Sequence, residues 1–119
     1  YPARFGAIFY GSTSPAMHEA LDALAGHGIY INALRVRAFP FQNEIADFVA
    51  SHSKVIVIEQ NFDGQLMTLL VNEAGVNPAS LIALRHYDGT PITARFITQE
   101  IRDLVSHLNV RPLREGRVA

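Results

Sequence analysis

Blocks of apolar residues alternate with blocks of helical periodicity along the chain, and together they predict four strands and four helices in turn. Residues 5–10 (FGAIFY) and 54–59 (KVIVIE) are nearly continuous apolar runs, which is typical of strands covered on both faces in a parallel sheet. Residues 29–36 (IYINALRV) and the short run 81–84 predict two further strands. The β-branched residues 55–58 favour a central place for the third strand.

Between these strands, apolar residues recur at i, i+3, i+4 and i+7 or close to it, the spacing that lines one face of a helix. They are Met17, Ala20, Leu21 and Leu24; Ile45, Phe48 and Val49; Leu66, Met67, Leu69, Leu70 and Val71; and Ile101, Leu104, Val105 and Leu108. Ser14 before Pro15 predicts the first helix start, with Ser14 as the N-cap and Pro15 at the first helical position. Gly75 predicts the end of the third helix, and the fourth is expected to begin near Thr98.

Strands joined by single helices imply right-handed crossovers, and hence a three-layer, doubly wound α/β fold with a mostly parallel sheet. We expect one domain over residues 1–108 and a basic tail over 109–119, where Arg111, Arg114 and Arg117 stand close together. In such folds, ligands and partners meet the carboxyl ends of the strands where the strand order reverses. The loops that follow the first and third strands are therefore the places to expect a site.

The loop after the first strand carries three hydroxyls, on Ser12, Thr13 and Ser14. At the amino end of a helix these groups and the free backbone N–H groups suit an anion, although the same composition is typical of an ordinary helix cap. Both interpretations stay open from the sequence. This loop is the first candidate for a crevice or an interface.

The loop after the third strand is dense in carboxylates and amides. Its candidate residues are Glu59, Gln60, Asn61, Gly64 and Gln65. Such a segment can orient a ligand or form an interface. The alternative is local, with Asn61 and Asp63 capping the third helix.

Charge and cysteine content exclude several function classes. A net charge of −1 provides no field that would gather nucleic acid, and the absence of cysteine rules out disulfides and cysteine-ligated iron–sulfur clusters in this chain. We expect neither a membrane partner nor a signal peptide, because no apolar run reaches the length of a span and the start lacks the basic and apolar layout of a leader. Since the chain begins with Tyr1, we expect a segment of a longer protein. We expect that protein to be cytoplasmic.

Motifs for catalysis are also missing. The five histidines stand singly, and no GxSxG, GxGxxG or GxxxxGK[ST] motif occurs, so we predict neither a catalytic residue nor a metal site in this chain. Arg35 and Arg37 alternate on the second strand, where they could pair with an acidic partner or stand solvated on an edge strand.

Taken in order, several short motifs resemble the C-terminal, transketolase C-terminal-like domain of the α subunit of 2-oxoacid:ferredoxin oxidoreductases. They are Tyr10-Gly11-Ser12-Thr13-Ser14, His18-Glu19-Ala20, Leu34-Arg35-Val36-Arg37, Phe39-Pro40-Phe41, and Val57-Ile58-Glu59-Gln60-Asn61 with Gly64-Gln65-Leu66. Tyr87-Asp88-Gly89-Thr90-Pro91 resembles the version in 2-oxoglutarate enzymes, except that a basic residue more often stands at position 90. The resemblance covers roughly residues 5–108.

The resemblance implies strand order 2-1-3-4, with one antiparallel strand at an edge. It implies a whole enzyme that uses thiamine diphosphate and Mg to decarboxylate a 2-oxoacid, 2-oxoglutarate or pyruvate. Electrons pass through iron–sulfur clusters to ferredoxin, and CoA accepts the acyl group. It also implies that this domain holds no cofactor and is inactive alone. Its partners would be the remaining α-subunit domains and the thiamine-diphosphate-binding β subunit, in an oligomer that meets ferredoxin only indirectly.

Two other functions fit the alternating pattern less well. A small flavodoxin-like FMN electron carrier would use the hydroxyl-rich first loop for the flavin phosphate, but the chain lacks a clear pair of aromatic-bearing loops for the ring. A phosphoacceptor receiver domain would need paired acids after the first strand and an Asp after the third. The chain has Gly11 and Ser12 at the first place and Glu59 at the second.

Overall fold

Four parallel strands form one sheet in the order β2-β1-β3-β4, as predicted. This computed structural model describes residues 4–10, 13–36, 42–59, 65–72, 74–86 and 92–118, without the side chains of Gln42, Gln65 and residues 108–118. The strands are β1 (Phe5–Tyr10), β2 (Ile31–Val36), β3 (Lys54–Glu59) and β4 (Leu81–Arg85). The helices are α1 (Ser14–Gly26), α2 (Gln42–Ala50), α3 (Gln65–Asn72) and α4 (Ala94–Val118), with a 3₁₀ turn at Pro78–Ser80.

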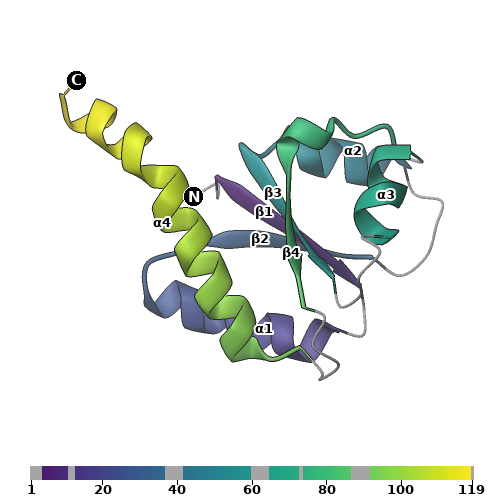
Figure 1. Cartoon of the computed structure of the whole chain (residues 1–119), viewed down its shortest axis with the longest axis horizontal. Helices are drawn as coiled ribbons and strands as arrows, with labels where there is room; N and C mark the ends of the chain where they lie inside the picture. Colours follow the sequence, from purple (N-terminus) through teal and green to yellow (C-terminus); the bar gives the residue numbers. More distant parts are fainter. Residues whose placement is uncertain are drawn as a thin grey trace.

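Helices cover both faces of the sheet, so the fold is three-layered. Figure 1 shows α1 and α4 on one side of the strands and α2 and α3 on the other. The strand residues alternate between the two cores that result: Ala7 and Ile56 pack toward α1 and α4, whereas Ile8 and Val57 pack toward α2 and α3. All four side chains are fully buried, because β1 and β3 are the two central strands.

The two ends of α1 show how its sequence sets its length. The N-cap is Thr13, without a side-chain capping hydrogen bond, so the prediction of Ser14 as cap was one residue late. Pro15 is therefore the second helical residue and not the first. Its missing N–H costs nothing there either, because the N–H groups of the first turn have no partner within the helix. At the other end Gly28 has φ 78°, while its N–H donates to Ala25 O and the N–H of Ile29 donates to Leu24 O. This is a Schellman motif. It requires one residue in the left-handed conformation, which glycine adopts without strain.

Helix α4 begins four residues before the predicted start. The N–H of Phe96 donates to Oγ1 of Thr93 at 3.1 Å, which makes Thr93 the cap. The hydroxyl of Thr98 instead donates back to Ala94 O at 2.7 Å, inside the helix. The helix therefore gains Ile97 as a fully buried residue, and it continues to Val118. The predicted boundary between domain and basic tail at residue 108 falls within this helix and stays a prediction.

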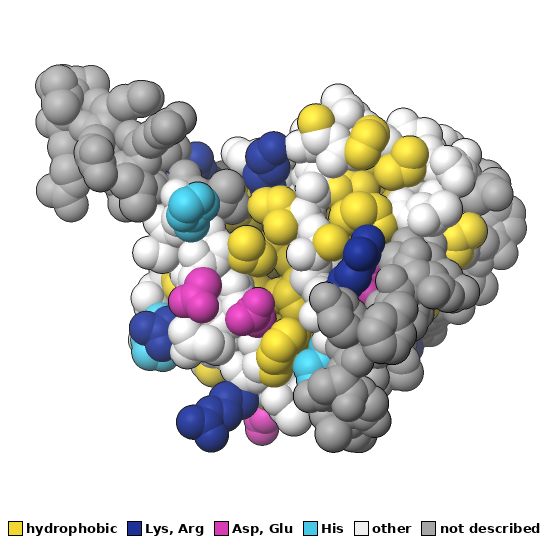
Figure 2. Space-filling view, viewed as in Figure 1, with side chains coloured by type: hydrophobic (Ala, Val, Ile, Leu, Met, Phe, Trp, Pro, Cys, Tyr) yellow, Lys and Arg dark blue, Asp and Glu magenta, His cyan; other side chains and the backbone are white. Residues whose placement is uncertain are grey.

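β2 and β4 form the two edges of the described sheet. Arg35 on β2 is exposed, which fits the solvated-edge interpretation, and Arg37 lies outside the described residues. The antiparallel edge strand that the resemblance implies is not among the described strands. On the face in Figure 2, apolar side chains gather along β4, and charged and histidine side chains gather over α4. Within the described ranges, no helix combines the length and apolarity that a membrane crossing requires.

Candidate functional site

The carboxyl ends of β1 and β3 lie side by side, which places the loops after these strands at one rim of the sheet. Phe9 pairs with Ile58, so Tyr10 and Glu59 end neighbouring strands, and Glu59 pairs with Arg85 on the other side. The chain leaves β1 toward β2 and leaves β3 toward β4, so this rim is where the strand order reverses. The predicted adjacency of the two strand ends is confirmed.

Glu59 is the buried charge at this rim, with only 2% of its surface exposed. The N–H of Leu66 donates to Oε1 at 2.7 Å, and the N–H of Met67 donates to Oε2 at 3.3 Å. These are the second and third residues of α3, whose N–H groups have no partner within the helix. The carboxylate therefore caps α3 from the end of the strand before it, and the helix dipole favours its negative charge.

The backbone of Glu59 also ties the rim together. Its carbonyl accepts a hydrogen bond from the N–H of His86 at 2.9 Å, just beyond the end of β4. The imidazole of His86 meets the ring of Phe96 edge-on, with the ring centroids 4.7 Å apart. One residue thus links the ends of β3 and β4 with the start of α3, which gives Glu59 a structural role at the rim.

Tyr10 lies next to Glu59, and the charge of Glu59 affects the pKa of its phenol. The pKa of the Tyr10 phenol is raised above its usual 10.0, first by burial and second by the negative charge of Glu59. Both effects disfavour the phenolate, so Tyr10 is a neutral hydroxyl over the whole physiological range. Together with the register partner Arg85, whose side chain is exposed, it completes a row of three polar residues across the rim.

The predicted site residues are only partly described. Thr13 and Ser14 are buried at the start of α1, and Gln65 begins α3, but its side chain is not described. Ser12, Gln60, Asn61 and Gly64 lie outside the described residues, as does Asp63, one of the two predicted caps of α3.

The structure adds Tyr10 and Arg85, which the sequence analysis did not single out. Both are the last residues of their strands, and both follow from the strand order. Aligning the carboxyl ends of neighbouring parallel strands could have found them.

The described residues offer no set of three or more His, Asp or Glu side chains that could hold a metal ion. Both oxygens of the Glu59 carboxylate accept hydrogen bonds from α3, so this carboxylate already serves to cap that helix. The rim can position two polar loops next to each other.

The fold places this chain in the class of doubly wound α/β domains, with a polar rim at the point where the strand order reverses. No family model matches the chain. It is 31% identical over 109 residues to the α subunit of 2-oxoacid:ferredoxin oxidoreductase 2 from Aeropyrum pernix, across 84% of this chain and 17% of that subunit.

Solved structures of the same enzyme class share the fold. The 2-oxoglutarate:ferredoxin oxidoreductase of Magnetococcus marinus, solved with 2-oxoglutarate, coenzyme A and succinyl-CoA bound, superposes with a TM-score of 0.75 at 29% identity. That match covers 85% of this chain and 18% of the other. The α chain of a probable 2-oxoacid ferredoxin oxidoreductase from Thermoplasma acidophilum matches with a TM-score of 0.53 at 22% identity, over 88% and 90% of the two chains. The latter likeness shows the fold alone.

The relatives and structural neighbours of this chain are thus 2-oxoacid:ferredoxin oxidoreductases, in agreement with the resemblance seen in the sequence. The chain spans less than a fifth of the Aeropyrum subunit and of the Magnetococcus chain.

Proposed function

We propose that this chain is the C-terminal, transketolase C-terminal-like domain of a 2-oxoacid:ferredoxin oxidoreductase α subunit, and that it serves assembly. The observation that carries the proposal is the match to the Aeropyrum α subunit, 31% identical over 109 residues yet confined to 17% of that subunit. Such a partial match supports the proposal that the chain is one module of a larger enzyme. The remaining α-subunit domains and a thiamine-diphosphate-binding β subunit supply the rest.

The whole enzyme decarboxylates a 2-oxoacid oxidatively, reduces ferredoxin and forms an acyl-CoA. The Magnetococcus enzyme was solved with 2-oxoglutarate, coenzyme A and succinyl-CoA bound, and this likeness favours 2-oxoglutarate over pyruvate as the substrate. This chain alone is inactive in the proposal. Its share of the reaction is to hold other parts of the enzyme in place.

Thiamine diphosphate and its metal do not fit the residues described here. A diphosphate-bound Mg²⁺ takes oxygen ligands, commonly from carboxylates, and the described residues contain no group of three acidic or histidine side chains close enough to hold a metal. Glu59 is already bound to the start of α3. Iron–sulfur clusters are normally ligated by cysteine, which this chain lacks. In the proposal both cofactors are bound elsewhere in the enzyme.

The rim is the part of this domain that we assign to assembly. Glu59 fixes the end of β3 and the start of α3, which are the two ends of the amide-rich segment 60–64. On the neighbouring strand β1, the chain continues into α1, whose first residues are the N-cap Thr13 and Ser14. Two polar segments therefore leave adjacent strands, and we assign Ser12, Gln60 and Asn61, rather than the buried Thr13 and Ser14, to contacts with polar groups of the surrounding polypeptide.

Co-purification tests this proposal. The complete α subunit is co-expressed with its thiamine-binding partner, beside a form that lacks this domain and a form with Asn61→Ala. Loss of the complex on deletion, and weaker assembly or turnover with Asn61→Ala at unchanged thermal stability, are expected. A complex of unchanged composition and turnover after the deletion would contradict the assembly role.

A further inference from the structure

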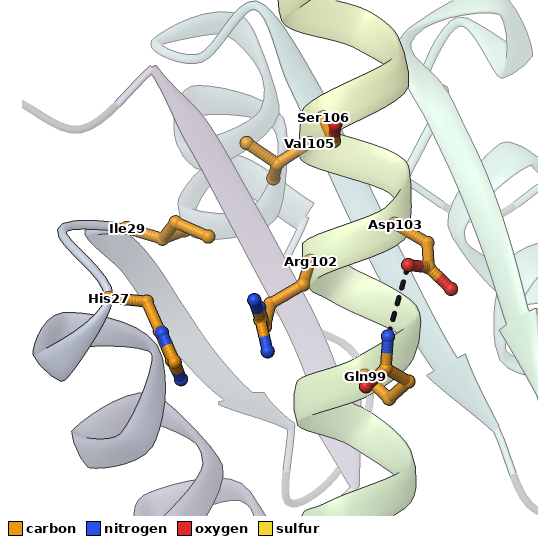
Figure 3. A pocket seen from close by; sticks show the side chains of 7 residues that line it. All are labelled: His27, Ile29, Gln99, Arg102, Asp103, Val105 and Ser106. Carbon is orange, nitrogen blue, oxygen red and sulfur yellow. Dashed lines mark hydrogen bonds between the residues drawn. The ribbon is translucent and has the colours of Figure 1, made fainter.

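A groove of about 320 Å³ lies on the α1 and α4 side of the molecule, away from the rim. It runs between the turn that follows α1 and the middle of α4. Its lining side chains are His27, Ile29, Gln99, Arg102, Asp103, Val105 and Ser106. Figure 3 shows Ile29 and Val105 facing each other from the two sides, and Arg102 and His27 pointing into the same gap.

The groove combines an apolar floor with a cation that is available for pairing. Val105 is only 6% exposed and Ile29 is half-buried, so both belong to the core on this side. Arg102 is exposed, and within the described part of the chain its guanidinium has no salt bridge or hydrogen bond. The carboxylate of the groove, Asp103, accepts a hydrogen bond from Nε2 of Gln99 at 3.1 Å, on the side of α4 away from His27 (Figure 3).

An exposed aromatic residue continues this surface. Tyr30 follows Ile29 in the chain and is 54% exposed, the one large apolar side chain in the described ranges that stands so far into solvent. Tyrosine and arginine are the residues that carry much of the binding energy at protein interfaces. We call the surface formed by His27, Ile29, Tyr30, Arg102 and Val105 the α1–α4 groove.

We propose that the α1–α4 groove docks a segment of the remaining oxidoreductase polypeptide whose Asp or Glu side chain enters the groove and pairs with Arg102. This inference rests on the proposed function, since the chain matches only 17% of the Aeropyrum subunit and 18% of the Magnetococcus chain, which leaves most of each to surround this domain. Charge complementarity selects an acidic segment, because Arg102 and His27 are the groups that face the gap. An apolar residue next to this acidic residue in the docked segment covers Ile29 and Val105. Tyr30 packs against the side of the same segment.

The experiment measures association in the assembled enzyme. Arg102→Glu is compared with Arg95→Glu, an equally charge-reversing change at an exposed arginine of the same helix outside the groove. Reversal in the groove is expected to weaken binding of this domain to the other subunits about tenfold or more, and added salt is expected to recover part of that loss because it screens the new repulsion. Arg102→Lys keeps the charge and retains most of the affinity. A photoreactive phenylalanine analogue at position 30 crosslinks to the partner, and one at exposed Glu44 on α2 does not.

The outcomes separate this inference from the function on which it rests. If the wild-type chain assembles but Arg102→Glu and Arg95→Glu bind equally well, or position 30 yields no crosslink, the docking assignment is wrong and the proposed function stands. If the wild-type chain does not assemble with the enzyme at all, both fail. Equal thermal midpoints of the two reversed variants serve as the control for folding.

Discussion

At the scale of single residues, Glu59 decides the geometry of the rim. It is a buried carboxylate whose two oxygens accept hydrogen bonds from the backbone of α3, so its loss leaves two N–H groups of the first helical turn without partners. Glu59→Gln keeps the shape but replaces one acceptor with a donor. We expect it to lower the free energy of unfolding by about 2 kcal/mol, measured by urea denaturation.

The same substitution at an exposed glutamate separates the loss of the hydrogen bonds to α3 from the loss of a negative charge as such. Glu100 is exposed on α4, and Glu100→Gln is expected to change stability by less than about 0.5 kcal/mol. Equal effects of the two substitutions would show that the bonds from Glu59 to α3 contribute nothing.

Tyr10 provides a prediction about pH. Its pKa in the folded protein is raised above the usual 10.0, so above that pH the unfolded chain loses this proton while the folded chain still keeps it. The unfolded state then binds fewer protons, and the free energy of unfolding falls as the pH rises from 10.0 toward the raised pKa. Tyr10→Phe should remove this part of the slope in denaturation curves recorded at several alkaline pH values.

Tyr30→Phe, at an exposed tyrosine, is the control for that measurement. Glu59→Gln should lower the pKa of Tyr10 only in part, because burial is the larger cause and remains. Spectrophotometric titration of the phenols detects both effects. A Tyr10 that ionises at or below its usual pKa would contradict the described packing.

At the scale of elements, β1 and α2 approach each other closely at Gly6. A Cβ added there would lie 2.7 Å from Cε2 of Phe48 and 3.3 Å from Cγ of His52. His52 is itself held, since its Nδ1 lies 2.7 Å from Phe48 O and its Nε2 lies 2.9 Å from Nδ2 of Asn32. We expect Gly6→Ala to destabilise the protein by about 1–3 kcal/mol, because the phenyl ring must move.

A double-mutant cycle tests the cause. Phe48→Leu shortens the side chain, so the two changes together should cost about 1 kcal/mol less than the sum of the single changes in urea denaturation. Gly26→Ala is the control, since a Cβ at that helical position meets nothing within 4 Å and alanine favours helix. Additive effects at Gly6 and Phe48 would mean that the two side chains do not compete for space.

The elements also show what can be read from a sequence of this kind. Both central strands were predicted with the observed bounds, because their apolar runs end abruptly at Gly11 and after Glu59. The start of α4 was misplaced because Thr93 and Thr98 are equally good caps in isolation, and only the packing of Ile97 against the sheet distinguishes them. Local pattern specifies which elements exist, whereas tertiary contacts choose between competing ends.

The candidate site was predictable in position but not in detail. The rule for doubly wound sheets singled out the loops after β1 and β3, and the strand order implied by the family resemblance placed them side by side. The role of Glu59 could not be found this way, because it caps a helix whose first N–H partners lie seven and eight residues further along the chain. A local capping motif spans only three or four residues.

At the scale of the whole molecule, the proposed function gives this chain a small part in a large enzyme. The chain brings the ends of β1 and β3 together at one rim of a parallel sheet, and it has a groove with an exposed arginine on one helical face. The chain matches 17% of the Aeropyrum subunit and 18% of the Magnetococcus chain, so its contacts with other parts of such an enzyme would decide its function. An FMN electron carrier would be a yellow protein after flavin-replete expression, whereas an assembly domain without a cofactor is expected to be colourless.

The most direct test is 2-oxoglutarate-dependent, CoA-dependent reduction of ferredoxin by the complete enzyme, by the enzyme without this domain, and by this chain alone. We predict full turnover for the first, at least about a hundredfold less for the second because misplaced active-site parts lose that much, and none for the third. Undiminished turnover without the domain, or oxidation of 2-oxoglutarate by the isolated chain, would contradict its assignment as an assembly domain.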